Sequence, residues 1–268
     1  MLRDITLGQY MPGDTVVHRL DPRTKIILTI FYIAIIFCVT SPLWYIIPLG
    51  YLLAVSKLSG LTPKRLLKSV KPLRFLLILT FLLNLFFSSG TTVWIHWGFL
   101  RVTREGFTTA VHFSMRLIFL VAGTSILTLT TSPVALSDGI EMLLRPLKAI
   151  HFPAHELAMM MTIALRFIPT LIEEADKIMK AQMARGADFE SGNLIKRAKA
   201  MIPLLVPLFV SAFRRAGDLA MAMEARCYHG GEGRTRLRVL KYTKNDAYAL
   251  LVTIGTLAVT ILCGMWVK

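Results

Sequence analysis

Two arginines at the ends of amphipathic segments are the residues best suited to chemistry in this sequence. Each stands after an alanine near the end of a helical pattern, and the two lie 41 residues apart. A guanidinium at a helix tip presents a rigid fork of donors that can pair with a carboxylate through two hydrogen bonds. This pattern predicts two docking points for acidic grooves. The predicted docking residues are Ala184, Arg185, Gly186, Ala225, Arg226 and Cys227.

Helix capping is the simpler explanation of the same residues. Gly186 is suited to the left-handed conformation that stops a helix, and Arg185 compensates the negative end of the helix dipole. At the second end Cys227 occupies the glycine position, so the turn there is expected to use Gly230-Gly231 instead. A repeated ending within one polar segment favours docking over capping alone.

The elements that must position these arginines are two predicted helices, over 170–185 and about 203–226. In the first, apolar residues recur at helical spacing and charged residues take the other face. Methionine is concentrated in and around both helices, and its flexible side chain can repack against different apolar partners. A methionine-rich core is the alternative. The candidate partner surface consists of Met159, Met160, Met161, Met179, Met183, Met221 and Met223.

Catalytic, metal and cofactor motifs give no comparable signal. The stretch GGEGRT at 230–235 lacks the lysine and the spacing of a phosphate-binding loop, so we expect no ATP hydrolysis by this chain. His151 and His155 are four residues apart, but no H-E-x-x-H pattern accompanies them, and we expect no metal site. No catalytic residue and no cofactor is predicted. Arg116 lies within an apolar run, where a bundle hydrogen bond and a substrate path are both open.

Composition places the chain in a membrane. Its 268 residues are 54% hydrophobic and 18% charged, with a net charge of +15. The cations flank apolar runs, which favours membrane topology over nucleic-acid binding, and no nucleic-acid recognition module is present. Cys38, Cys227 and Cys263 are too far apart in sequence for a metal knuckle or a disulfide framework.

Apolar runs and flanking cations predict an all-α, polytopic membrane protein. The predicted spans are 26–39, 43–55, 75–87, 106–131 and 247–267. The first two runs are short, so they form either a hairpin of two spans or one broken span. The basic loop at 57–74 is expected on the cytoplasmic side. The predicted regions are a membrane region of about four spans (1–131), cytoplasmic coupling helices without a clean apolar run of 18 residues (132–245) and a C-terminal span (246–268).

Several stretches together resemble the T component of energy-coupling factor transporters, the EcfT/CbiQ family. These are LDPRTKI at 20–26, TTSPVAL at 130–136, IEMLLRPLK at 140–148 and FPAHELAMMMTIALRFIPTL at 152–171. AQMARGAD at 181–188 and MEARCYHGG at 223–231 stand where the two signature motifs of the family belong. The resemblance covers nearly the whole chain, and cysteine in place of the second glycine is a departure from the family pattern.

The resemblance implies a non-catalytic coupling subunit in the plasma membrane of a prokaryote. Its partners would be two ABC-type ATPase subunits, a small membrane-embedded substrate-binding S component that can be exchanged, and membrane lipids. Arg185 and Arg226 would each dock into one ATPase. The chain is more similar to shared, vitamin-type members than to dedicated cobalt or nickel members. A self-contained secondary transporter and an intramembrane enzyme are weaker alternatives, because no internal repeat and no ligand motif is evident.

Overall fold

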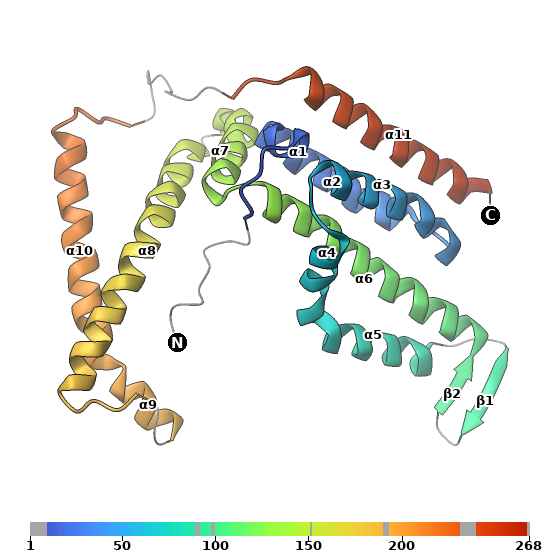
Figure 1. The fold of residues 1–268 in the computed structure, drawn as a ribbon, viewed down its shortest axis with the longest axis horizontal. Helices are drawn as coiled ribbons and strands as arrows, with labels where there is room; N and C mark the ends of the chain where they lie inside the picture. Colours follow the sequence, from blue (N-terminus) through green and yellow to red (C-terminus); the bar gives the residue numbers. More distant parts are fainter. Residues whose placement is uncertain are drawn as a thin grey trace. The chain divides into compact units, whose positions relative to one another are not determined.

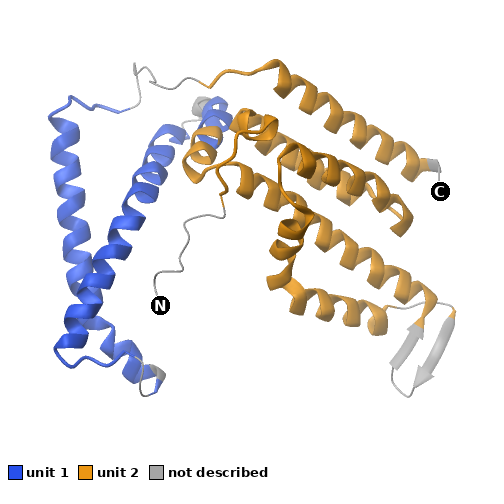
Figure 2. Ribbon diagram, in the orientation of Figure 1, with its two compact units in different colours: residues 1–7, 140–238 blue, residues 8–139, 239–268 orange. Residues whose placement is uncertain are grey.

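The computed structural model describes residues 10–88, 92–97, 100–150, 152–189, 193–230 and 240–266. The fold is helical, with one short antiparallel hairpin (Figure 1). This confirms the predicted all-α membrane class. The chain divides into two compact units, residues 140–238 with 1–7, and residues 8–139 with 239–268 (Figure 2), which we call unit 1 and unit 2.

Unit 2 contains most of the helices. Its elements are α1 (Val16–Arg19), α2 (Pro22–Cys38), η1 (Pro42–Tyr45), α3 (Ile46–Leu58), α4 (Pro63–Val70), η2 (Lys71–Leu73), α5 (Arg74–Phe87), β1 (Val93–Trp97), β2 (Leu100–Thr103), α6 (Arg104–Thr130) and α11 (Lys244–Trp266). The helix α7 (Pro133–Leu144) begins in unit 2 and ends in unit 1. Unit 1 continues with η3 (Arg145–Ile150), α8 (Ala154–Ala184), α9 (Leu194–Ala200) and α10 (Ile202–Glu224).

The core of unit 2 forms where α2, α3 and α4 pack on α6. A cluster of buried apolar side chains fills this space, including Tyr32, Tyr45, Leu66 and Phe119. Gly123 permits the closest approach, since a Cβ added there would lie 1.9 Å from the ring of Tyr32. Tyr32 also donates from its hydroxyl to the carbonyl of Phe119 (3.2 Å), so α2 is held against α6 by shape and by a hydrogen bond.

The first two apolar runs form two separate helices joined at residues 39–41. The two helices lie antiparallel. Lys25, near the start of α2, and Val55, near the end of α3, line the same cavity, and the rings of Tyr32 and Tyr51 stack 5.6 Å apart. α11 then packs along α2 through small side chains. Thr253 and Thr260 on its inner face are buried, and Tyr51 bonds the hydroxyl of Thr253 at 2.9 Å.

Within the described residues, the helices with enough length and apolar character to cross a membrane differ in part from the prediction. They are Pro63–Phe87, Arg104–Thr130, Ala154–Ala184, Ile195–Glu224 and Lys244–Met265, with Pro42–Leu58 as a shorter apolar helix. The expectation that 132–245 holds no long apolar run was therefore wrong. α8 carries only Glu156 and Arg166 as charged residues before Glu173, and α10 carries none before Arg214, so both concentrate their charges in the second half; this hides the apolar stretch when the segment is read as a whole.

Candidate functional site

The end of α8 has the geometry of a Schellman motif. The N–H of Ala187 donates to the carbonyl of Gln182, and the N–H of Gly186 donates to Met183, both at 3.0 Å. Gly186 has a φ of 89°, which only glycine adopts without strain. Sequence reasoning predicted this stop. The motif satisfies carbonyls that the helix end leaves free, and it holds Arg185 at the last turn of a rigid helix.

The end of α10 repeats this geometry 41 residues later. The N–H of Tyr228 donates to the carbonyl of Met223 (3.0 Å), and the N–H of Cys227 donates to Glu224 (2.8 Å). Cys227 itself has a φ of 55°, the one positive φ at a non-glycine position within the described residues. The expectation that Gly230-Gly231 would replace it was wrong, because the hydrogen-bond register requires the left-handed residue at position 227. Gly231 lies outside the described residues.

Both arginines are exposed and available for a partner. The guanidinium groups of Arg185 and Arg226 make no hydrogen bond and no ion pair with any residue that the structure describes; only their backbone N–H groups are bonded, within the helix ends. The neighbouring residues of each motif are exposed as well, namely Ala184, Gly186, Ala225 and Cys227. The two predicted docking triplets are therefore alike in backbone geometry and in exposure.

α8 and α10 cross at a polar contact that is equally far, in sequence, from the tip of each helix. Glu174 on α8 accepts from the guanidinium of Arg215 on α10 (2.7 Å) and from the hydroxyl of Ser211. Arg185 is eleven positions after Glu174, and Arg226 is eleven positions after Arg215. At 1.5 Å per residue, each tip lies roughly 16 Å from the crossing.

The helices run in opposite directions, so the two tips point to opposite ends of the pair (Figure 1). A carboxylate at position 174 faces a guanidinium at position 215, which occupies the equivalent place one 41-residue interval later. The contact is therefore equally spaced from the two tips in sequence and complementary in charge. This arrangement leaves two similar cationic ends at opposite ends of the helix pair.

The predicted methionine surface is only partly exposed. Met160, Met161, Met183 and Met221 are exposed, while Met159, Met179 and Met223 are half-buried. Sequence reasoning missed a larger apolar surface on the first half of α10. Its exposed residues are Ile202, Leu205, Val206, Phe209, Val210 and Phe213. The run of apolar residues on every side of 202–213 was the available signal, because such a segment leaves some of them uncovered whichever face packs.

A second group of contacts joins the start of α2 to the first turn of α11 and to the residues just before it. Asp21 is buried, and its N–H donates to the buried carboxylate of Asp246 (2.9 Å). Arg23 grips Asp21 through two hydrogen bonds (2.9 and 3.0 Å), donates to the carbonyl of Leu240 (3.3 Å), and lies 4.0 Å from the ring centre of Tyr242. We call these five residues the α2–α11 clamp.

The same turn also contacts α6 at the second stretch that carried the family resemblance. Lys25 donates through Nζ to the carbonyls of Thr130 (3.0 Å) and His18 (3.1 Å). LDPRTKI and TTSPVAL, more than a hundred residues apart in sequence, thus meet in unit 2. Their role in the structure is to tie helix ends together, and no charge-relay geometry is present among these described residues.

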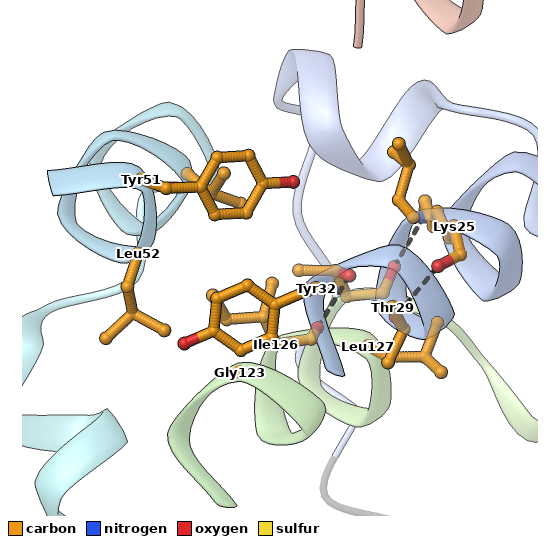
Figure 3. Close-up of a pocket in the computed structure, with 11 residues that line it drawn as sticks. Lys25, Thr29, Tyr32, Tyr51, Leu52, Gly123, Ile126 and Leu127 are labelled. Atoms are coloured by element: carbon orange, nitrogen blue, oxygen red, sulfur yellow. Dashed lines mark hydrogen bonds between the residues drawn. The ribbon is translucent and has the colours of Figure 1, made fainter. Parts of the chain in front are cut away.

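A small cavity lies beside this turn, between α2, α3 and α6 (Figure 3). Its volume is about 60 Å³, and its wall includes Lys25, Tyr32, Tyr51 and Ile126. Sites for organic ligands are typically several hundred Å³. This cavity is therefore too small to enclose a vitamin-sized molecule.

The remaining candidates have structural partners. Arg116 donates to His112 Nε2 (2.9 Å) and to the carbonyl of Val39 (3.5 Å), in agreement with a bundle hydrogen bond. His155 Nδ1 lies 3.0 Å from Glu141 Oε1, whereas His151 falls outside the described residues. Among the residues that the structure describes, no group of three metal-ligating side chains occurs.

Comparison with known proteins identifies the family. The family model CbiQ, described as a cobalt transport protein, matches residues 13–237. A protein from Acidaminococcus fermentans described as energy-coupling factor transporter transmembrane protein EcfT is 57% identical, over 95% of both chains. Proteins with that description from Thermosediminibacter oceani (56%) and Bacillus subtilis (46%) are each matched over 96% of this chain and 97% of their own. The chain therefore belongs to the CbiQ/EcfT family and is the transmembrane T component of an energy-coupling factor transporter.

Proposed function

We propose that this chain couples two ABC-type ATPase subunits to an exchangeable S component, and that Arg185 and Arg226 each enter one ATPase. The observation that carries this proposal is the pair of exposed guanidinium groups on matching helix ends, equally distant from the Glu174–Arg215 contact. Two docking ends of the same geometry fit two similar partners. The chain itself would be non-catalytic, with ATP hydrolysis carried out by the ATPases.

The proposed mechanism is mechanical. Schellman hydrogen bonds stabilise the ends of both helices, so a displacement imposed on a tip would be passed along the helix. When nucleotide binding draws the ATPases together, the two tips move toward each other and the helices pivot about the polar crossing. This places the coupling helices on the cytoplasmic side, as the basic flanks of the apolar runs predict.

The exposed apolar surface of the coupling helices is the proposed seat of the S component. It combines the exposed methionines with the Phe209 and Phe213 face of α10. Exposed aromatic and methionine side chains suit a partner that is itself apolar and that is exchanged, because methionine adapts to different shapes. Pivoting of α8 and α10 would tilt such a partner and release its substrate.

A vitamin-type substrate is proposed over cobalt or nickel. Relatives 46–57% identical carry the EcfT description, although the family model is named for cobalt transport. Uptake of labelled vitamins and of labelled Co²⁺ by cells carrying this transporter distinguishes the two. Ion-driven uptake by liposomes that contain this chain alone would instead support a secondary transporter.

The decisive experiment reverses each cation. Arg185→Glu and Arg226→Glu should each weaken co-purification of the ATPase subunits at least tenfold, because a paired guanidinium is replaced by a repelling carboxylate. Transport should fall in parallel. Lys180→Glu and Arg214→Glu are the matched controls, since they make the same charge change at exposed positions on the same helices but away from the tips. If the tip variants retain both ATPases and normal uptake, the proposal is wrong.

A further inference from the structure

A second cationic surface lies on α4 and the turn after it. Lys64, Lys68 and Lys71 are exposed and project from one side, at intervals of four and three residues. Leu66 and Val70 on the opposite side are buried in the core of unit 2. The helix is therefore held by its apolar face, with its lysine side turned outward. Arg65 and Arg74 add two further exposed cations.

The segment that carries α4 is firmly fixed. Ser56 donates from its hydroxyl to the carbonyl of Leu61 (2.8 Å), and the N–H of Leu61 donates back to the carbonyl of Ser56 (3.0 Å). Gly60 has a φ of 69° in this turn, and Leu61 is buried. The lysines consequently project from a rigid base, so little conformational entropy of the backbone is lost when they bind a ligand.

No acidic residue neutralises these cations. The sequence has no Asp or Glu from residue 22 to residue 104, and none of the five cations forms an ion pair with a residue that the structure describes. The guanidinium of Arg65 lies 3.4 Å from the sulfur of Met11, which is on the N-terminal segment. Asp14 on that segment is already bound by Arg19, whose hydrogen bond lowers the pKa of the Asp14 carboxyl.

The cations stand directly before an exposed apolar helix. α5 begins at Arg74, and Phe75 and Phe87 at its two ends are 75% and 82% exposed. Five further side chains of α5 are exposed, namely Leu76, Ile78, Leu79, Leu82 and Leu83. Residues Pro63–Phe87, which include α4 and α5, form a stretch of 25 residues that is long and apolar enough to cross a membrane. The lysines at its start therefore lie at one end of that span, at the level of the headgroups.

We propose that Lys64, Lys68 and Lys71 bind the phosphate groups of anionic phospholipids. The chemistry is that of an ammonium cluster on a headgroup phosphate, with α5 in contact with the acyl chains of the same lipids. Each cation near an anionic membrane surface contributes a factor of roughly five to binding. This site is independent of the ATPase docking proposed above, because it uses neither coupling helix.

The test uses the full-length chain in nanodiscs that contain zwitterionic and anionic phospholipid in equal amounts. Native mass spectrometry after release counts the lipids that remain bound. The wild-type chain should retain anionic lipid preferentially, and Lys64→Gln/Lys68→Gln/Lys71→Gln should reduce that enrichment about tenfold or more. Lys64→Arg/Lys68→Arg/Lys71→Arg should keep the enrichment of anionic lipid, because the positive charge is retained.

The matched control is Lys177→Gln/Lys196→Gln/Lys199→Gln, which removes the same charge from exposed positions on α8 and α9. This variant should bind anionic lipid as the wild type does. Equal loss in both triple variants would show a general effect of net charge and overturn the site. An unchanged lipid preference in the α4 variant, with reduced co-purification of a protein partner, would assign these lysines to that partner instead.

Discussion

At the residue scale, Cys227 has an unfavourable backbone conformation at the end of α10. Its φ of 55° places a non-glycine residue in the left-handed region, at a cost of roughly 1–2 kcal/mol. The equivalent residue, Gly186, adopts a φ of 89° without this cost. We expect Cys227→Gly to raise the stability by about 1 kcal/mol, and Gly186→Ala to lower it by a similar amount.

Thermal unfolding of the purified variants measures both changes, and ATPase co-purification should stay at the wild-type level for Cys227→Gly because Arg226 is untouched. Gly217→Ala is a useful reference, since a Cβ there meets nothing within 4 Å. It lies inside α10, where alanine is the better helix former. A loss of stability in Cys227→Gly would contradict this account of the second helix end.

At the element scale, the α8–α10 crossing depends on Glu174. Its carboxylate is paired with Arg215 and bonded by Ser211, and both ion-pair partners are partly exposed. The ion pair therefore stabilises the helix pair by only about 0.5–1 kcal/mol. Its main effect is to fix the angle between α8 and α10. We expect Glu174→Ala to broaden the distance distribution between spin labels placed at the two helix tips.

Electron-spin distance measurements in a background without native cysteines test this expectation. The exchanged pair Glu174→Arg/Arg215→Glu should restore a narrow distribution, because the attraction is regained with the partners reversed. Glu173→Ala, at the exposed neighbouring position, is the control and should leave the distribution unchanged. Equal widths for wild type and Glu174→Ala would show that apolar packing alone sets the crossing.

The contact between α2 and α6 depends in the same way on one small residue. A methyl group at position 123 would overlap the ring of Tyr32, and that ring is buried and stacked on Tyr51. Gly123→Ala should therefore destabilise unit 2 by about 1–3 kcal/mol. Gly50→Ala on α3 is the control, because a Cβ there meets nothing within 4 Å. If Gly123→Ala unfolds at the same temperature as Gly50→Ala or at a higher one, the predicted overlap with the Tyr32 ring is wrong.

Local signals were readable from the sequence, and distant ones were not. The end of α8 was predictable because the last apolar residue of the helical pattern, Arg185 and Gly186 all lie within one turn of each other. The left-handed Cys227 was not, since cysteine carries no preference for that conformation. The bond between Asp21 and Asp246 joins residues 225 positions apart, and no local pattern announces it. The hairpin β1–β2 lies between two predicted spans, 75–87 and 106–131, where no strand was predicted.

At the scale of the whole molecule, the α2–α11 clamp lies where the chain returns from unit 1 to unit 2. Unit 1 ends at residue 238, and the clamp begins two residues later with the carbonyl of Leu240 bonded by Arg23. Tyr242 and Asp246 follow, each in contact with the start of α2. Within the described residues, the chain that re-enters unit 2 is therefore fixed to the start of α2 from residue 240 onward.

We expect the clamp to be needed for coupling but not for ATPase docking. Arg23→Gln leaves the carboxylate of Asp21, which is buried, without its guanidinium partner, and it frees Leu240 and Tyr242. The reconstituted transporter should then hydrolyse ATP at a rate near that of the wild type while substrate uptake falls severalfold. Arg19→Gln is the matched control. It breaks an ion pair of similar geometry whose side chains are 69% and 78% exposed, and uptake should be unaffected. Parallel loss of hydrolysis and uptake in Arg23→Gln would instead mean that the clamp supports the fold alone, because a loss of coupling by itself lowers transport without slowing the ATPases.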